Sequence, residues 1–390
     1  MKIAIIGFGG RISGVYHNLS ARAGTRQNLV GWADPMPHPP GLAQVPEAGQ
    51  GFRDHREMLR ELKPDAVMIG SPNHLHLEHI RDSLATGAKV FSEKPVVVSV
   101  EDSWAAAELL KQYGQERFLV GLVLRSSPLF REAMREVASG RLGRAVSMEA
   151  NEHLHPEHGG YIARDWRRKR EYSGSHILEK CCHDIDLLQA MLGGRIQRVA
   201  SFGGRSIFTP VNAGLVKDGR YKQWKTGWAE SSTDDPFTAD SDIVDHQIFS
   251  AEMETGAKLT FHCNNHNPWS QRRWLWCGTQ GAWESDFTTG RWRVQQAYGE
   301  PEIHELSAAG GGHGGADEAM ADDLVATWFE GKPFPVPTKA AIEAGLAAMG
   351  IDLAQREGRI VDLSPWWAQL DALLGASPAA AAHAPAATRG

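Results

Sequence analysis

Residues 2–23, KIAIIGFGGRISGVYHNLSARA, decide how the first part of this chain folds. The segment begins with a continuous apolar run, passes through a glycine-rich turn and ends in a helical pattern. A strand, a turn and a helix in this order form the opening unit of a parallel α/β sheet. The same alternation continues to about residue 125, which predicts a doubly wound domain over residues 1–124 with helices on both faces.

The second part of the chain has a different pattern. After residue 125, stretches of strand character follow one another without helices between them, and METGA is a plausible tight turn between two of them. Helical patterns return over residues 316–331 and 338–358. We therefore predict an α+β domain over residues 125–374 with a large, mostly antiparallel open sheet. Residues 375–390 are rich in Ala and Pro and are predicted to be a disordered tail.

Composition excludes several classes of protein. The chain has 390 residues, 42% of them hydrophobic and 23% charged, and its formal net charge is -6. This charge gives no basic field for nucleic acid. The first apolar run ends at Gly7, no apolar run reaches membrane-spanning length, and four Cys are too few for a disulfide framework. We expect a cytoplasmic protein with no nucleic-acid or membrane partner.

The glycine-rich turn, GFGGRISG, has the context of a dinucleotide fingerprint, since it follows a strand and opens a helix. Gly7 and Gly9 allow the backbone to approach a pyrophosphate at the helix N-terminus. Ile12 occupies the third glycine position, so the match is imperfect. The alternative is a glycine-rich turn that serves another ligand. We expect the cofactor to contact the remaining residues of the turn as well: Phe8, Gly10, Arg11 and Ile12.

Asp34 supports the dinucleotide interpretation. It ends the second predicted strand, where an acid can hydrogen-bond the adenosine ribose. Residues 35–38, PMPH, offer no Arg for a 2′-phosphate. NAD is therefore the expected cofactor, and NADP is less favoured.

Two later strands of this domain end in polar motifs, SPNHLH and SEKP. Ligands of open α/β sheets bind outside the carboxyl ends of the strands, so these motifs should face the same crevice as Gly9. The residues concerned are Ser71, Asn73, His76, Glu93 and Lys94. A Lys beside a positively charged nicotinamide has its ammonium form disfavoured and could act as a base. The alternative interpretations are structural: His76 would be an ordinary His at the start of a helix, and Lys94 would be a surface Lys before a proline turn.

Residues 173–194, SGSHILEKCCHDIDLLQAMLGG, predict a largely buried helix with an unusual polar face. Glu179, His183 and Asp186 follow one another at spacings of four and three, so they share that face. One interpretation is a structural ion-pair network, and the other is the wall of a catalytic site.

A basic segment, RDWRRKRE, precedes this helix. We expect substrate contacts from Arg125, Arg164, Trp166, Arg167, Lys180 and His183. His153, His155 and His158 lack a metal-ligand pattern and more simply belong to a substrate loop. His313, in GGGHGGADE, is a weaker site candidate. No metal is expected.

Taken together, these motifs resemble the glucose–fructose oxidoreductase/inositol dehydrogenase (Gfo/Idh/MocA) family over nearly the whole chain. The matching stretches include the glycine-rich turn, SPNHLH, SEKP, RDWRRKREYSGSHILEKCCHDID, DHQIFSAEMETGA, CGTQG and GGGHGGADE. The resemblance implies a Rossmann domain followed by an α/β domain whose large open sheet often mediates oligomers, here a dimer or tetramer. It also implies hydride transfer between NAD(P) and a hydroxyl carbon of a sugar, cyclitol or related compound.

The resemblance also implies roles for individual residues. Lys94, Glu179 and His183 would form the catalytic group, with Glu179 standing where the family has Asp. Trp166 and Arg167 match a family Trp-Arg pair that precedes the catalytic helix. The leading interpretation is an NAD-dependent dehydrogenase of a sugar, cyclitol or sugar derivative. The alternatives are an NAD-retaining, redox-neutral glycosidase and a non-catalytic NAD-binding sensor.

Overall fold

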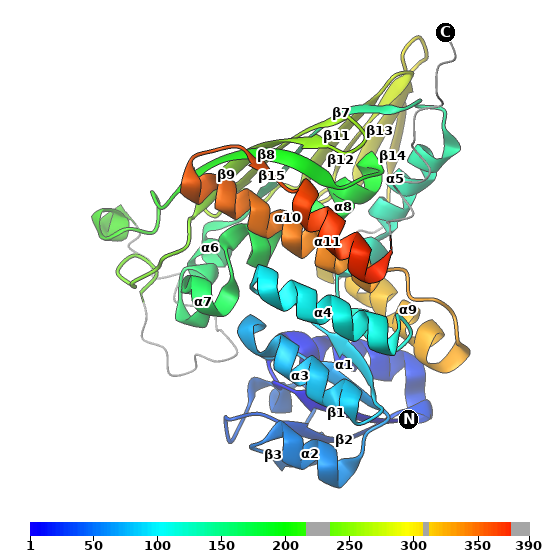
Figure 1. Ribbon diagram of the computed structural model, residues 1–390, viewed down its shortest axis with the longest axis vertical. Coiled ribbons are helices and arrows are strands. Elements are labelled where there is room, and N and C mark those ends of the chain that lie inside the picture. Colours follow the sequence, from blue (N-terminus) through cyan, green and yellow to red (C-terminus); the bar gives the residue numbers. More distant parts are fainter. Residues whose placement is uncertain (216–234, 307–311, 376–390) are drawn as a thin grey trace.

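Two β-sheets form the framework of the molecule in the computed structural model, which describes residues 1–215, 235–306 and 312–375 (Figure 1). Within these residues, a six-stranded sheet has the order β3-β2-β1-β4-β5-β6, and a nine-stranded sheet has the order β14-β13-β12-β11-β7-β10-β9-β8-β15. The predicted tail, apart from Gly375, lies outside the described residues. The predicted α/β plus α+β fold class is confirmed.

The six-stranded sheet is parallel throughout and is buried between helices. Its apolar runs carry no alternation because both faces are covered. The last strand of the sheet is short, since it ends at Val120 and a 3₁₀ turn, Val123–Ser126, follows. The elements are β1 (Lys2–Ile6), α1 (Gly10–Ala23), β2 (Asn28–Ala33), β3 (Gln50–Phe52), α2 (His55–Leu62), β4 (Ala66–Ile69), α3 (His76–Ala85), β5 (Lys89–Ser92), α4 (Val100–Tyr113) and β6 (Phe118–Val120).

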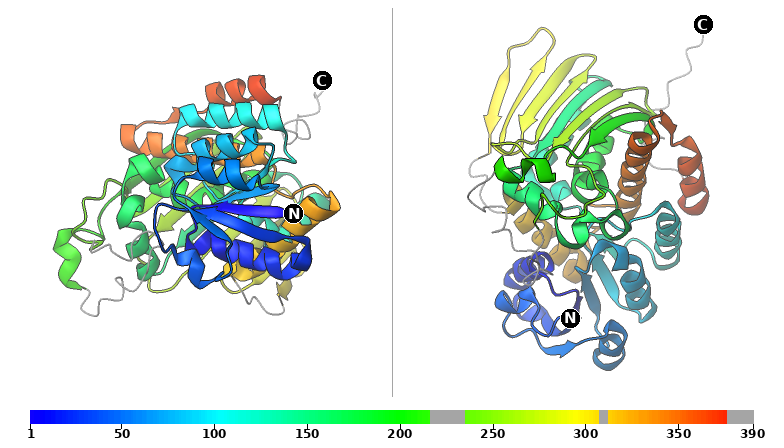
Figure 2. Two further views of the ribbon diagram at one scale, coloured as in Figure 1. Left: turned by 90° about the horizontal axis from the view of Figure 1, so that it is seen from below. Right: turned by 90° about the vertical axis from the view of Figure 1, so that its left-hand side faces the viewer.

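The nine-stranded sheet is antiparallel except for the pairing of β7 with β10. Its helices pack on one face (Figure 2). The other face exposes side chains such as Phe202, Ile248 and Thr260. METGA forms the turn between β9 and β10, as predicted. The strands are β7 (Ala145–His153), β8 (Ile196–Gly204), β9 (His246–Met253), β10 (Lys258–Asn264), β11 (Arg273–Gly278), β12 (Gly281–Asp286), β13 (Arg291–Gln296), β14 (Glu302–Glu305) and β15 (Val361–Asp362).

The covered face of this sheet carries large aromatic side chains. Trp274, Trp276 and Trp283 are buried, and the Trp276 indole donates to the Met191 carbonyl at 2.9 Å. This bond satisfies a buried indole N–H and fixes helix α8 against the sheet. The helices of this part are α5 (Pro128–Ser139), α6 (Pro156–Ile162), α7 (Arg170–Ser173), α8 (His176–Leu192), α9 (Ala316–Glu330), α10 (Thr338–Glu357) and α11 (Ser364–Leu374).

Helix α8 begins and ends at clear local signals. The Ser175 side chain accepts a hydrogen bond from Leu178 N–H, which caps the N-terminus. Gly193 adopts a left-handed conformation with φ of 70° and ends the helix. Between these residues the helix is buried on almost every side, so its polar residues must find partners or face a cavity.

Helix α9 follows the second sheet in sequence but packs against α1 of the first domain (Figure 1). Two ion pairs join these helices, Arg11 Nη1 to Asp317 Oδ1 at 2.5 Å and Arg22 Nε to Asp322 Oδ1 at 2.6 Å. The turn that leads into α9 is thereby brought beside the glycine-rich turn.

Candidate active site

A cavity of about 480 Å³ lies where the carboxyl ends of the parallel strands meet helix α8. Many of the residues expected in a site line it: Gly9, Gly10, Arg11, Ser71, Asn73, His76, Glu93, Lys94, His158, Trp166, Arg167, Glu179, Lys180, His183 and His313. Five further residues, which no motif indicated, also line the cavity: Pro40, Gln44, Gly70, Tyr161 and Ile162. One cavity thus unites motifs that are widely separated along the chain.

Some residues expected at the site do not line this cavity. The Arg125 guanidinium makes a bidentate ion pair with Asp186, at 2.6 and 2.7 Å, because the two residues face one another at the junction of the domains. Asp186 therefore holds a guanidinium instead of facing the cavity beside His183. Arg164 is also buried away from the lining.

The first His-containing segment is not a single loop. His153 ends β7 and stacks edge-on against His262 at 4.7 Å, while His155 is partly exposed and lies 3.9 Å from Glu157. Only His158, on helix α6, lines the cavity.

The glycine-rich turn has the shape of an anion cradle. Gly7 has φ of 73°, and a Cβ there would lie 2.4 Å from the backbone of Ser71. A Cβ at Gly9, which caps α1, would meet no atom within 4 Å, so this position opens onto the cavity. The free N–H groups of the first turn and the Arg11 guanidinium suit a pyrophosphate. The lack of a side chain at Gly7 allows the turn to pack against Ser71, and the lack of one at Gly9 allows a ligand to approach the backbone. Both features fit a bound dinucleotide.

Phe8 and Ile12 have their side chains in the core beneath the turn, so only their backbone can serve a cofactor. Asp34 is also buried, and its carboxylate accepts the N–H groups of Phe8 at 2.9 Å and Met36 at 2.8 Å. Burial raises the pKa of Asp34. Each carboxylate oxygen has a second lone pair, which leaves acceptor capacity for a ribose hydroxyl.

Arg53 lies close to Asp34, although no sequence signal indicated it. Its guanidinium donates to the Pro35 carbonyl, at the start of residues 35–38, and its charge acts on the Asp34 carboxylate. The cation comes from the loop after β3, because β3 pairs with β2. At this position the Asp34 carboxylate would repel a 2′-phosphate, whereas the Arg53 guanidinium would attract it.

We expect Asp34→Ser to weaken NAD binding and to narrow the preference for NAD over NADP. The reason is that the substitution removes a carboxylate that repels a 2′-phosphate and leaves Arg53 to attract it. Calorimetric titration with both reduced cofactors measures the preference. In Asp34→Ser/Arg53→Ala the gain for NADPH should disappear, and tighter NADPH binding by the native protein would contradict the assignment of Asp34.

Lys94 and Glu179 form the centre of the cavity wall. Lys94 Nζ donates to the Glu179 carbonyl and lies 3.7 Å from the carboxylate oxygen Oε2, which also accepts Asn73 Nδ2–H at 2.8 Å. Burial is the largest single influence and disfavours the Lys94 ammonium, but Glu179 together with Cys182 and Glu93 raises the pKa of Lys94 overall. Burial likewise opposes the Glu179 charge, yet Lys94 and Arg167 lower its pKa. The two groups are therefore charged partners.

His183 is the neutral member of the group. Burial lowers the pKa of His183 well below its usual range, and nearby Lys94 and His313 add to the effect. Its Nδ1 has no hydrogen-bond partner among the described residues. His313, in the turn before α9, stands with its ring centroid 6.3 Å away and pairs with Asp317 at 2.9 Å. A neutral imidazole with an uncommitted nitrogen can accept a proton from a bound ligand.

A second buried charge group lies beneath this wall. Glu152 contacts Lys180 at 3.3 Å and also pairs with Arg272, whose Nε lies 2.9 Å from Asp184. Burial opposes the Glu152 charge, but Arg272 and Lys180 hold its pKa well below the usual range. Burial and the Glu152 charge raise the pKa of Asp184 well above its usual range.

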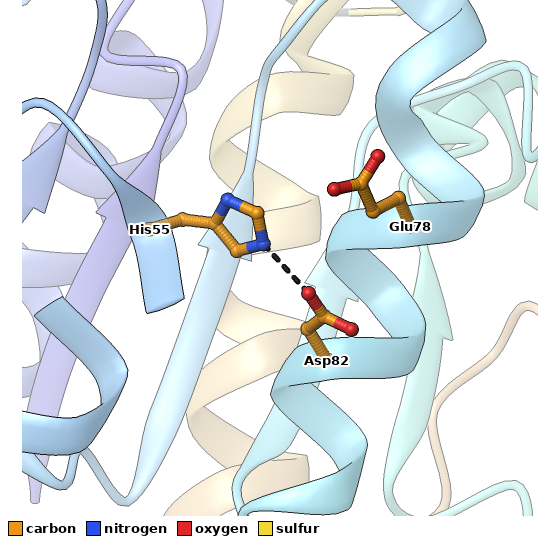
Figure 3. A group of neighbouring side chains, drawn as sticks. All are labelled: His55, Glu78 and Asp82. Carbon is orange, nitrogen blue, oxygen red and sulfur yellow. Dashed lines mark hydrogen bonds and ion pairs between the residues drawn. The ribbon is translucent and has the colours of Figure 1, made fainter. Parts of the chain in front are cut away.

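Another cluster of polar side chains lies apart from the cavity. Figure 3 shows His55 of α2 pointing toward Glu78 and Asp82 of α3, with His55 Nε2 2.9 Å from the Asp82 carboxylate. Arg56 contacts both carboxylates, Glu78 at 2.5 Å and Asp82 at 2.9 Å. Because the Arg56 guanidinium contacts both acids and the His55 ring contacts Asp82, we interpret the cluster as an ion-pair network.

The parallel sheet, the cradle at its carboxyl edge and the Lys-Glu-His wall opposite define a dinucleotide-dependent oxidoreductase. Residues 1–122 match the family described as an oxidoreductase family with an NAD-binding Rossmann fold, and residues 130–284 match the Gfo/Idh/MocA C-terminal domain. The chain belongs to the Gfo/Idh/MocA family of NAD-binding oxidoreductases.

Individual relatives extend over different shares of the chain. A Bacillus subtilis protein named as an oxidoreductase, YteT, is 26% identical over 366 residues, which cover 82% of this chain and 83% of that protein. The scyllo-inositol 2-dehydrogenase (NAD(+)) of the same organism is 28% identical over 153 residues, 38% of this chain and 42% of that enzyme. Levoglucosan dehydrogenase in complex with NADH and levoglucosan has a TM-score of 0.75 at 17% identity, over 93% of this chain and 99% of that one. This last likeness shows the fold.

Proposed function

We propose that the protein is an NAD-dependent dehydrogenase that acts on a hydroxyl carbon of a sugar, cyclitol or sugar derivative. The observation that carries the proposal is the convergence of Lys94, Glu179 and His183 in the cavity that also contains the dinucleotide cradle. Relatives named for inositol and 1,5-anhydro-D-fructose support the substrate class.

The cofactor end of the site is assigned to the α1 cradle, with Asp34 at the ribose. NAD, when bound, supplies the acceptor for the hydride. The protein must then bind the reacting hydroxyl, stabilise the charge that grows on its oxygen and remove its proton.

Lys94 and His183 divide these tasks. The Lys94 ammonium, kept charged by Glu179, donates a hydrogen bond to the reacting oxygen and stabilises negative charge there. Neutral His183 accepts the hydroxyl proton in oxidation and returns it in reduction. Glu179 is held by Asn73 and Arg167, and it positions Lys94.

The redox-neutral glycosidase interpretation uses the same groups, so the assay must follow both reactions. Two bacterial relatives are named as hydratases, a reaction without net oxidation. Sugars and aryl glycosides are incubated with added NAD while NADH absorbance and aglycone release are recorded. Accumulation of one NADH per product supports the dehydrogenase, whereas aglycone release without NADH would overturn it. A preparation that binds NAD and sugars but catalyses neither reaction would indicate a sensor.

A homo-oligomer in the cytoplasm is the proposed setting. Phe202 of β8 and Ile248 of β9 are cross-strand partners on the open face of the large sheet and are 69% and 45% exposed. An exposed apolar pair of this kind favours association with a second copy. The four cysteines are free thiols, as suits a reducing compartment. Among the described residues, no helix is both long and apolar enough to cross a membrane.

A further inference from the structure

We propose that the substrate is a sugar acid, whose carboxylate binds Arg167 and Trp166 beside Glu179, at the substrate end of the cavity. This inference rests on the proposed function, and it specifies the chemical class of the substrate. Three features carry it: a fixed guanidinium, unpaired donors and an excess of positive charge.

Arg167 is held in a rigid orientation. Its Cζ atom lies 4.2 Å from the ring centroid of Tyr161 and 4.2 Å from that of Trp166, so both rings contact the guanidinium. A guanidinium that is fixed in this way loses little conformational entropy when a ligand binds along its edge.

Three donors of this pair form no hydrogen bond with the residues that the structure describes. Among the described residues, Arg167 Nε and Nη1 and Trp166 Nε1 are buried and have no hydrogen-bond partner. The nearest carboxylate is Glu179, whose Oε1 lies 3.4 Å from Arg167 Nε without forming a hydrogen bond. Buried donors are costly to leave unpaired, and such groups are the ones that a ligand acceptor satisfies.

The charges of the cavity point to the same ligand. At the substrate end, Lys94 and Arg167 share the single carboxylate of Glu179. Beneath them, Lys180 and Arg272 lie against two acids, Glu152 and Asp184, so this second group adds no excess charge. In the cofactor half, by contrast, Arg11 has both Glu93 and Asp317 as partners. The substrate end therefore holds the excess of positive charge, and an anionic ligand would compensate it.

A carboxylate fits this arrangement better than a phosphate does. The edge of a guanidinium presents parallel donors to the two oxygens of a planar carboxylate. Lys94, Arg167 and Glu179 leave an excess of one positive charge, which matches a carboxylate, whereas a phosphate ester carries nearly two negative charges. The apolar surfaces of Tyr161 and Ile162 provide contact for a sugar ring.

The experiment compares hexuronic acids with their parent hexoses and with the matching hexose 6-phosphates. Calorimetry on the NADH-loaded protein measures binding, and NADH formation with added NAD measures kcat/KM. Because hydrogen bonds to charged groups are at stake, we expect at least one uronate to exceed its parent hexose by about 10- to 100-fold. Arg167→Met should abolish most of this preference for the uronate. Trp166→Phe, which keeps an aromatic ring but loses the indole N–H, should reduce the preference.

The uronate-to-hexose ratio of kcat/KM distinguishes lost carboxylate recognition from a general loss of activity. A general loss lowers kcat/KM for both sugars of a pair, because both depend on the same catalytic group, and leaves their ratio unchanged. Arg168→Met is the matched control, since Arg168 pairs with Asp240 outside the cavity, and this variant should keep the native ratio. Equal or tighter binding of every hexose, preference for the phosphates, or an unchanged ratio in Arg167→Met would overturn the sugar-acid assignment. If uronates bind selectively but no NADH forms, the dehydrogenase proposal fails while the carboxylate site stands.

Discussion

Replacing Lys94 by Met is expected to lower kcat by about 10²- to 10⁴-fold, because the variant loses the ammonium that stabilises charge on the reacting oxygen. Met keeps most of the length of the side chain, so the cavity wall should remain packed. NADH binding, measured by fluorescence titration, should remain near native, since the cradle is formed by other residues. Lys180→Met is the matched control, and it should lose less kcat because Lys180 already contacts Glu152. A larger loss in Lys180→Met than in Lys94→Met would transfer the role to Lys180.

The pH dependence should report His183 independently of Lys94. Because burial lowers the pKa of His183 well below 6.5, the imidazole is neutral at pH 7 and remains so as the pH falls through 6.5. The value of kcat/KM for oxidation should therefore be flat through pH 6.5 and should decline only in more acidic solution, where imidazolium can no longer accept a proton. His183→Asn should lose this acid limb along with most of kcat. If the kcat/KM profile instead shows an acid limb centred near pH 6.5 that persists in His183→Asn, that limb belongs to another group.

Much of the fold and part of the site could be predicted from the residues because the controlling interactions are local. The apolar run, the glycine turn and the helical pattern of residues 2–23 predict a strand followed by a helix without any information from distant segments. The spacing of Glu179 and His183 on a buried helix placed them on one face, and both line the cavity. The polar ends of two parallel strands, at Asn73 and Lys94, converge because parallel strands end at one edge of the sheet.

The remaining features depend on contacts between segments distant in sequence. Arg125 was expected at the substrate, but Asp186 of α8 holds it at the domain junction. Arg53 stands near Asp34 only because β3 pairs with β2, which no motif announces. The position of His313 depends on α9 packing back against α1. Tyr161 has no local signal at all, yet it is one of the two rings that fix Arg167.

The charge group beneath the cavity allows the largest stability effect to be predicted. Arg272 is buried, and its guanidinium is the common partner of Glu152 and Asp184. Arg272→Met leaves the Glu152 carboxylate buried with only Lys180 to balance it. Removal of one member of a buried ion group costs about 3–5 kcal/mol, so the free energy of unfolding should fall by that amount. Denaturant unfolding followed by fluorescence of the buried tryptophans measures it.

The matched variant, Asp184→Asn, should behave differently. Burial and the neighbouring Glu152 charge raise the pKa of Asp184, although Arg272 opposes the shift, and this direction favours the protonated carboxyl. An amide reproduces both the carbonyl acceptor and the donor of a protonated carboxyl. We expect Asp184→Asn to change the free energy of unfolding by less than about 1 kcal/mol, against the several kcal/mol of Arg272→Met. Equal large losses in both variants would mean that Asp184 is ionised and that Lys180 and Arg272 are fully balanced. A small loss in Asp184→Asn would instead mean that the Asp184 carboxyl is protonated in the native protein.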